Sequence, residues 1–521
     1  MPRTELAAVA FVVALCAFPA HAQFGRGAGD YSTIGSDAQR SSWVRTDAKI
    51  SPAALQKPGF EFLWKVKLEG DGRQANALTP AALLTFYIGY RGFRALAFSG
   101  GSADKVLAVD TDLGRVEWTK SLMSGTAPQG TAACPGGMTA NVARPVSAAF
   151  PASMPVGRGG GSGRGAAAKS GVGEPGEGAT ILKEMAARGS ANSFNPPPPA
   201  NPPAGRRGAA DAGRGAPAPN PYARGAAWLY AISSDGMFHS MYVSNGEEPH
   251  PPVRFLPANA NAQGLIVVDN AAYATTTGAC GGAPDAVWAL DVASEQAASW
   301  KPAAGGIAGT GGVAFGGDGT LFVATTSGDL AALEPKTLKV KDVFKAGQEL
   351  TSSPLVFQQK DKAMIAAATS DGRIHAIDAA ALSGAGMQSA PVAAGSGFRP
   401  GALASYQDSA GTRYILVPTP SSVVALKLTD QGFETAWTSP EIAAPLTPLI
   451  VNGVVFAASN GDRSRPAVLY ALDGVTGKPL WNSGKTITSF ARNGGISAGG
   501  SQVYLGTYDG TLYAFGFPIE H

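Results

Sequence analysis

The stretches VLAVDTDLGRVEWTK (Val106 to Lys120) and LYALDGVTGKPLWNS (Leu469 to Ser483) follow one pattern. In each, an apolar run ends in Asp, Gly follows four residues later, and Trp follows four residues after the Gly. A tight turn between two short strands explains this spacing, because Asp accepts hydrogen bonds from turn amides and Gly reaches a positive φ. The Trp supplies a large apolar surface for packing. We therefore interpret the Asp, Gly and Trp as structural residues.

The pattern recurs along the chain. The residues that close the third strand of each unit lie 42 to 49 residues apart over the last six intervals. They are Asp110, Ser244, Asp291, Glu334, Asp378, Lys427, Asp473 and Phe515. Eight such units, each with four short strands, predict an all-β fold: an eight-bladed β-propeller. An open solenoid stack is the alternative, and it would need no closure.

The two ends of the chain complement each other. The last unit ends at Phe517-Pro518 without a Trp-bearing fourth strand, whereas FEFLWKVKL (Phe60 to Leu68) is a strand without a unit. We expect this N-terminal strand to complete the last blade, with Trp64 in the Trp position. Such pairing removes an exposed sheet edge.

The repeat resembles the pyrroloquinoline-quinone (PQQ) repeat A-x-D-x-x-T-G-x-x-x-W, most clearly at Ala471 to Trp481. The segment Asp37 to Leu55 is also similar to the lead-in before the first blade of that superfamily. The resemblance implies a propeller of the quinoprotein type. It leaves function open, since the superfamily includes quinoprotein alcohol dehydrogenases and also cofactor-free scaffolds such as the outer-membrane assembly lipoprotein.

The sequence departs from the dehydrogenases of this superfamily. Those enzymes place PQQ under a disulfide of adjacent cysteines, hold Ca²⁺ with Glu and Asn beside a catalytic Asp, and often carry a C-x-x-C-H haem segment. Neither a Cys-Cys pair nor C-x-x-C-H occurs in this sequence, and we find no matching Ca²⁺ constellation. We therefore name no catalytic residue and no metal ligand, and we assign no cofactor, with PQQ left open.

The N-terminus indicates export. Leu6 to Phe18 is an apolar run of 13 residues, too short to span a bilayer, and Ala20-His21-Ala22 forms a small-x-small cleavage site. We expect residues 1–22 to be a signal peptide and the mature protein to be periplasmic or secreted, not transmembrane. An N-terminal anchor that stays uncut is the alternative.

One segment differs from the rest in composition. Residues 151–225 are rich in Gly, Pro, Ala and Arg, and this composition favours a disordered insert. The segment carries a net charge of +5, more than the +3 of the whole chain, so the basic balance is no sign of nucleic-acid binding by the fold. We expect it in blade two, after a first strand at Val146 to Phe150. The predicted organisation is then a lead-in at 23–59 and one propeller formed by 60–150 and 226–519.

Two cysteines remain after removal of the signal peptide, and an even count in an exported chain suggests a disulfide. Cys134 precedes the first strand of blade two and Cys280 lies between the second and third strands of blade three. Loops of these two kinds share one face of a propeller, so we predict a Cys134–Cys280 bridge. Two unrelated thiols are the alternative.

First strands line the centre of a propeller. Arg144, Arg399 and Arg492 stand just before the first strands of blades two, six and eight, with Asn493 beside the last. They suggest a cationic ring at the mouth of the central channel for a carboxylate ligand. The alternative is that each Arg binds loop carbonyls or an acidic side chain.

Three functional hypotheses follow from the sequence. We favour an exported propeller that acts as a binding or assembly scaffold, as a monomer, with a protein or cell-envelope partner and no nucleic acid. The alternative is a PQQ-dependent quinoprotein dehydrogenase that oxidises alcohols or sugars with a divergent site. A polysaccharide or envelope binder that uses the insert as a tether is a third hypothesis.

Overall fold

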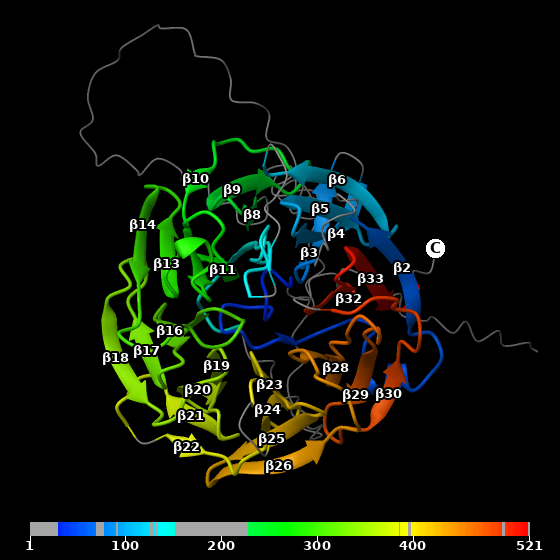
Figure 1. Cartoon of the computed structure of the whole chain (residues 1–521). Helices are drawn as coiled ribbons and strands as arrows, with labels where there is room; N and C mark the ends of the chain where they lie inside the picture. The colour runs from blue at the N-terminus through cyan, green and yellow to red at the C-terminus, as the bar shows by residue number, and fades with distance from the viewer. Residues whose placement is uncertain are drawn as a thin grey trace, which may run out of the picture.

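Eight twisted sheets stand around one axis, in a ring that closes (Figure 1). The structure is a computed structural model that describes residues 30–68, 78–89, 92–123, 130–131, 133–151, 228–384, 386–393, 398–491 and 495–518. The predicted signal peptide, nearly all of the predicted insert, and Arg492 with Asn493 lie outside the described residues. Within the described residues the fold is the predicted all-β, eight-bladed propeller.

Each blade is an antiparallel sheet that runs from the central channel to the outer surface. From the centre outward, blade 1 contains β3 (Ala82–Gly89), β4 (Gly92–Gly101), β5 (Lys105–Asp110) and β6 (Arg115–Ser121), and blade 2 contains β8 (Trp228–Ile232), β9 (Met237–Tyr242) and β10 (Val253–Arg254). Blade 3 contains β11 (Ala262–Val268), β12 (Ala271–Thr276), β13 (Ala286–Asp291) and β14 (Gln296–Trp300). Blade 4 contains β15 (Ala314–Phe315), β16 (Leu321–Ala324), β17 (Asp329–Leu333) and β18 (Val340–Lys345).

In the same order, blade 5 contains β19 (Leu355–Gln359), β20 (Lys362–Ala368), β21 (Ile374–Asp378) and β22 (Met387–Gln388), and blade 6 contains β23 (Ala404–Gln407), β24 (Arg413–Pro418), β25 (Val423–Thr429) and β26 (Gly432–Thr438). Blade 7 contains β27 (Leu449–Val451), β28 (Val454–Ala458), β29 (Leu469–Asp473) and β30 (Pro479–Asn482). Blade 8 contains β31 (Ile496–Gly499), β32 (Gln502–Gly506), β33 (Thr511–Gly516) and β2 (Glu61–Lys67).

The burial of each strand follows its place in the blade. The second strand of blade 7, β28, has the sequence VVFAA and is buried at every position, because neighbouring blades cover both of its faces. The outer strand β30, PLWN, is half-buried or exposed. This gradient explains why the repeat reads as two apolar runs followed by a polar strand with one Trp.

The last blade contains strands from both ends of the chain. β2 pairs antiparallel with β33, so the sheet order is β2-β33-β32-β31. Trp64 of β2 donates its indole N–H to Thr111 O of blade 1 at 2.9 Å. The N-terminal strand therefore occupies the outer position of blade 8 and also contacts blade 1.

The Asp, Gly and Trp of the repeat act together at the contact between blades. In blade 7, Asp473 Oδ1 accepts hydrogen bonds from the amides of Val475 and Thr476, which shapes the turn. Gly477 has φ +70°, and the Trp437 ring of blade 6 lies where a Cβ of this glycine would be, with its Cε3 2.6 Å from that position. The Trp of one blade thus packs on the turn glycine of the next.

We predict that Gly477→Ala lowers the free energy of unfolding by roughly 2–5 kcal/mol, because the new Cβ meets Trp437 in addition to the left-handed backbone. Gly484→Ala is the matched control. Its φ is +55°, but nothing lies within 4 Å of the position that its new Cβ would take, so about 1–2 kcal/mol is expected. Denaturant unfolding measures both, and equal losses would show that the contact with Trp437 contributes nothing.

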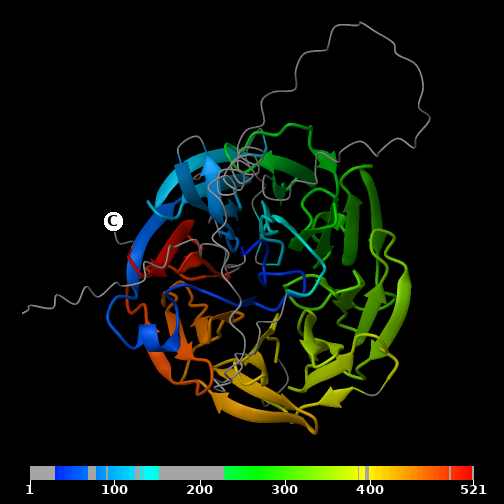
Figure 2. The same ribbon diagram turned by 180° about the vertical axis from the view of Figure 1, so that it is seen from behind.

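The segment before β2 fills the inside of the ring. Residues 30–47 cross the centre of the ring, as the view from behind shows (Figure 2). They include the two-residue strand β1 (Trp43–Val44), which pairs parallel with β27. The short helix α1 (Pro52–Leu55) then leads to β2. We call residues 30–47 the plug segment.

The plug segment hydrogen-bonds to every blade. In six blades an inner-edge amide donates to a plug carbonyl, namely Leu83 to Tyr31, Arg144 to Ser32, Phe315 to Ala38, Val356 to Gln39, Ser405 to Ser41 and Ile450 to Ser42, at 2.7–2.9 Å. Thr33 donates its hydroxyl to Leu265 O of blade 3, and Asp47 accepts from the Ser501 amide of blade 8. The inner strand edges, which would otherwise face water, are therefore satisfied by the chain itself.

The start of blade 2 differs from our expectation of a first strand at Val146 to Phe150. Ala143 makes an isolated bridge with Tyr230 of β8, and the next strand, β7 (Pro145–Val146), pairs parallel with β11 of blade 3. A bridge in one blade and a two-residue strand in the next replace a regular strand. The physical reason is that this stretch divides its backbone bonds among β8, β11 and the plug segment, which binds the Arg144 amide.

Candidate functional site

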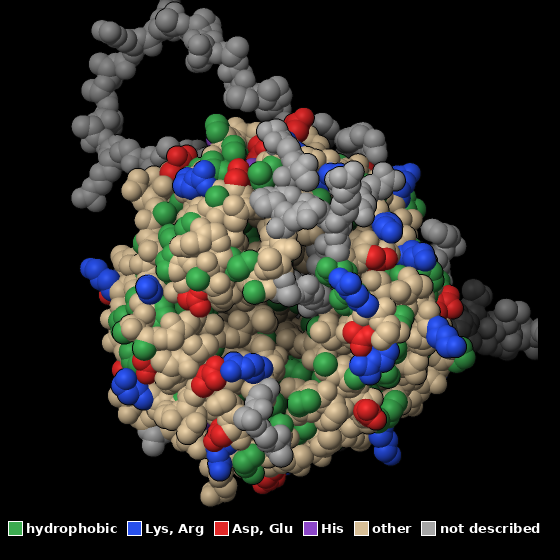
Figure 3. All heavy atoms as spheres, in the orientation of Figure 1, with side chains coloured by type: hydrophobic (Ala, Val, Ile, Leu, Met, Phe, Trp, Pro, Cys, Tyr) green, Lys and Arg blue, Asp and Glu red, His purple; other side chains and the backbone are tan. Residues whose placement is uncertain are grey.

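A cavity of about 500 Å³ opens at the centre of one face of the ring. Figure 3 shows the hollow on this face. Its wall consists of residues that precede inner strands, such as Thr310 before β15, and of loops after second strands, such as Thr419 and Pro420 after β24. The plug segment forms part of the lining through Tyr31 and Arg40. We call this cavity the central cup.

Arg40 is a buried cation without a carboxylate partner in its hydrogen bonds. Its Nε donates to Val313 O at 2.9 Å and its Nη2 to Gly264 O at 2.6 Å. Its Nη1 donates to Thr33 Oγ1 at 3.0 Å and Ile34 O at 2.6 Å. Burial lowers the pKa of Arg40 to about 10. The side chain therefore ties the plug segment to blades 3 and 4, and its donors are committed to protein oxygens.

Arg399 lies at the cup and is neutralised by an acid. Its two Nη atoms donate to the carboxylate of Glu349 at 2.7 and 3.0 Å, and these bonds raise the pKa of the Arg399 guanidinium. The Arg399 side chain is 59% exposed, so this ion pair is surrounded by water.

Arg144 lies under the plug segment and is not among the residues that line the cup. It is buried, and its Nη1 donates to Asp30 Oδ2 and to Leu83 O, both at 2.7 Å. Of the four residues proposed from the sequence, the described structure thus brings Arg399 alone to the cup. Arg492 and Asn493 lie outside the described residues.

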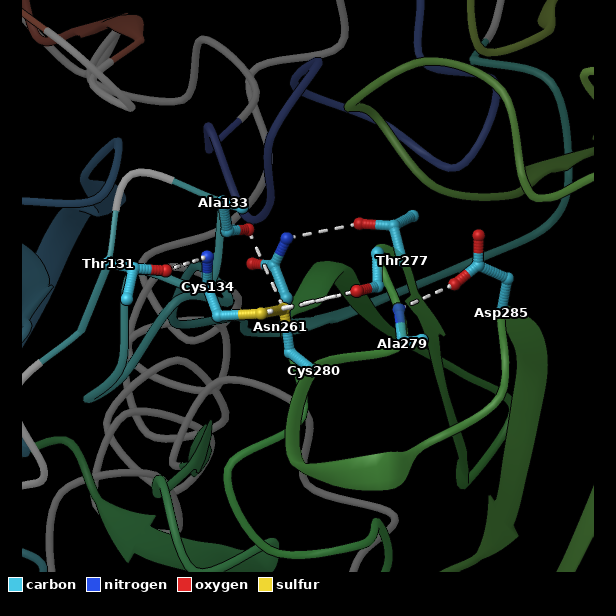
Figure 4. The surroundings of a disulfide bond; sticks show 9 residues. Thr131, Ala133, Cys134, Asn261, Thr277, Ala279, Cys280 and Asp285 are labelled. Carbon is cyan, nitrogen blue, oxygen red and sulfur yellow. Dashed lines mark hydrogen bonds between the residues drawn. A yellow bond between two sulfur atoms is a disulfide. The ribbon is translucent and has the colours of Figure 1, made fainter.

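A disulfide lies on the same face as the cup. Cys134 and Cys280 are joined, with Cα atoms 5.5 Å apart, as predicted from the loops that carry them (Figure 4). Cys280 begins the 3-10 helix η3 (Cys280–Gly282). Asn261, which lines the cup, donates from Nδ2 to Thr277 Oγ1 at 3.1 Å in the same loop. The bridge therefore fixes a loop that is bonded to the cup wall.

The remaining lining of the cup is neutral. The lining residues include neither Asp, Glu, Lys nor His among the described part of the chain. The polar side chains come from amides and hydroxyls, among them Asn141, Gln263 and Asn460. These amides were not predicted from the sequence. The feature that could have indicated them is their place in the repeat, beside the start of an inner strand or just after a second strand.

The described lining does not fit PQQ held by Ca²⁺. PQQ is a tricarboxylate, and both guanidinium groups of the cup are already bonded to protein oxygens. Ca²⁺ binds preferentially through carboxylates, which the described lining lacks. Within the residues that the structure describes, no three His, Cys, Asp or Glu side chains come together as metal ligands would.

Comparison with known proteins defines the class. The family described as "Outer membrane protein assembly factor BamB" matches residues 285–514, from blade 3 to blade 8. The chain therefore has the fold of an eight-bladed β-propeller, and its residues 285–514 are similar to a PQQ-like repeat family. None of the curated proteins matches the sequence.

Solved structures share the fold at low sequence identity. The quinohemoprotein alcohol dehydrogenase from Comamonas testosteroni aligns with a TM-score of 0.56 and 13% identity, over 95% of this chain and 81% of that one. A quinohemoprotein alcohol dehydrogenase from Pseudomonas putida HK5 aligns with a TM-score of 0.56 and 12% identity, with the same coverage. The computationally designed Ika8 protein aligns with a TM-score of 0.50 and 11% identity, over 88% of this chain and all of that one. At these identities the likeness concerns the fold alone.

Proposed function

We propose that this protein is an exported scaffold whose propeller binds a partner or ligand and performs no redox chemistry. The observation that carries the proposal is that the described lining of the central cup contains no acid, while both of its arginines are bonded to protein oxygens. The matching family is described as an assembly factor, which supports a role in binding protein or cell-envelope components.

Export is supported by two independent features. The N-terminus has the composition of a signal peptide, and the described structure contains a disulfide, which persists in oxidising compartments. Among the described helices, none has the length and apolar character needed to cross a membrane. Mass spectrometry of the mature protein is expected to find Gln23 at its N-terminus, and an intact Met1 would contradict cleavage.

The alternative, a quinoprotein dehydrogenase, is tested with the purified full-length protein. We expect no quinone absorbance in the near ultraviolet. We also expect no reduction of an artificial dye with alcohols or sugars after incubation with PQQ and Ca²⁺. Dye reduction that depends on added PQQ would overturn the scaffold proposal. A quinoprotein dehydrogenase of known activity, treated in parallel, shows that the assay works.

A further inference from the structure

Three side-chain amide oxygens in the described lining of the central cup, those of Asn141, Gln263 and Asn460, are buried without a hydrogen-bond partner. Asn141 is fixed by its Nδ2, which donates to Thr33 Oγ1, Val142 O and Leu265 O, so the other two amides are the ones free to turn. Gln263 belongs to the inner strand β11 of blade 3, and Asn460 follows β28 in blade 7. Gln263 Oε1 and Asn460 Oδ1 are buried without a partner among the described residues. A buried polar atom left unpaired costs about 1–3 kcal/mol. Both side chains are only partly buried overall, so each amide can turn toward the cup and meet a partner there.

The two amides stand on opposite sides of the cup. Blades 3 and 7 are four blades apart in a ring of eight, and β11 and β28 lie across the centre from each other (Figure 1). A primary amide offers two donors and one acceptor group in a plane. Neighbouring hydroxyl groups, each a donor and an acceptor, match this arrangement better than a carboxylate does.

The rest of the lining disfavours ions. An anion would have to displace hydrogen bonds that Arg40 and Arg399 already donate to protein oxygens, and a cation would find no carboxylate in the described lining. Six proline rings add a rigid apolar wall. They are Pro80, Pro354, Pro400, Pro418, Pro420 and Pro445. The C–H face of a sugar ring can pack on such a surface while its hydroxyls reach the amides.

We propose that the central cup reversibly binds a small neutral polyhydroxylated compound, a mono- or disaccharide in size, between Gln263 and Asn460. The cavity of about 500 Å³ is within the range of small-ligand sites. This inference rests on the proposed function, in that the cup binds its ligand without oxidising it.

The test is titration calorimetry of the mature protein with glucose, maltose and trehalose, at ligand concentrations up to the millimolar range. At least one probe is expected to bind saturably. Gln263→Ala and Asn460→Ala should each weaken binding about tenfold, which corresponds to about 1.4 kcal/mol. The side-chain oxygens of Gln263 and Asn460 have no partner in the ligand-free protein, so neither substitution breaks a hydrogen bond of that oxygen. Both variants should therefore melt at or slightly above the wild-type temperature.

Gln359→Ala is the matched control. Gln359 Oε1 is also buried and unpartnered, but this residue ends the inner strand β19 of blade 5 and is not among the lining residues of the cup. Its substitution should leave saccharide affinity unchanged.

The outcomes separate the two proposals. Absence of saccharide binding, or binding that both cup variants retain, overturns the inference, and the scaffold proposal stands if PQQ with Ca²⁺ also supports no dye reduction. PQQ binding that is lost in Gln263→Ala and accompanied by dye reduction overturns both. Saccharide binding with dye reduction would leave the site correct and the scaffold proposal wrong.

Discussion

Removal of residues 23–47 is expected to lower the free energy of unfolding by on the order of 5 kcal/mol or more. The deletion withdraws the plug segment from all eight blades and exposes the apolar surface that Tyr31 and Val44 bury. Burial of one such side chain contributes about 1.5–3 kcal/mol. Six inner-edge amides also lose their carbonyl partners to water. Circular dichroism melts and denaturant unfolding measure the effect.

Two further deletions serve as comparisons for the 23–47 deletion. Removal of residues 23–29 alone is the control, since it leaves every described contact of the plug segment in place, and its melt should lie above that of the 23–47 deletion. Removal of residues 23–68 also takes away β2, which leaves β33 as an open edge, so aggregation is expected. A synthetic peptide of residues 30–47 should raise the melting temperature of the 23–47 deletion. Identical melts for the two shorter deletions would refute a stabilising plug segment.

Replacement of both cysteines, Cys134→Ser with Cys280→Ser, is expected to cost about 3–5 kcal/mol of unfolding free energy. The bridge joins positions 146 residues apart, so it restricts the unfolded chain strongly. The loop closed by the bridge also contains the predicted insert at 151–225. Without the bridge, folding would bear the entropic cost of closing this long loop.

Reduction provides the control for this double variant. Dithiothreitol should shift the unfolding midpoint of the wild type to that of the variant and should leave the variant unchanged. Cys16 does not interfere, because it lies in the predicted signal peptide. Peptide mapping under non-reducing conditions that finds two free thiols in the exported protein would contradict the bridge.

Most of the fold could be predicted because its signals are local. The Asp–Gly–Trp turn recurs with a period near that of a blade, and each of its residues has a role that depends on a few neighbours, as Asp473, Gly477 and Trp437 show. The blade count followed from this period. The prediction of a first strand for blade 2 at Val146 to Phe150 was wrong. The chain there divides its backbone bonds among β8, β11 and the plug segment, and no local sequence pattern reveals that competition.

The candidate site was predicted less well, for a physical reason. Arg144 and Arg399 precede inner strands in the same way, yet one lies buried against Asp30 and the other stands at the cup with Glu349. The plug segment affects which arginine reaches the cup, because its Asp30 binds Arg144, which is not among the lining residues. The unpaired amides of Gln263 and Asn460 become visible only when all neighbours are in place.

By itself, the sequence determined the propeller, its eight blades, the strand that completes the last blade and the pair of cysteines that meet. These features arise from short-range periodicity and from the face on which each kind of loop emerges. The tertiary structure alone decided what fills the centre and what lines the cup. The centre collects single residues from units that are 40 or more residues apart, so its chemistry is set by how eight inner edges and one N-terminal segment share their hydrogen bonds.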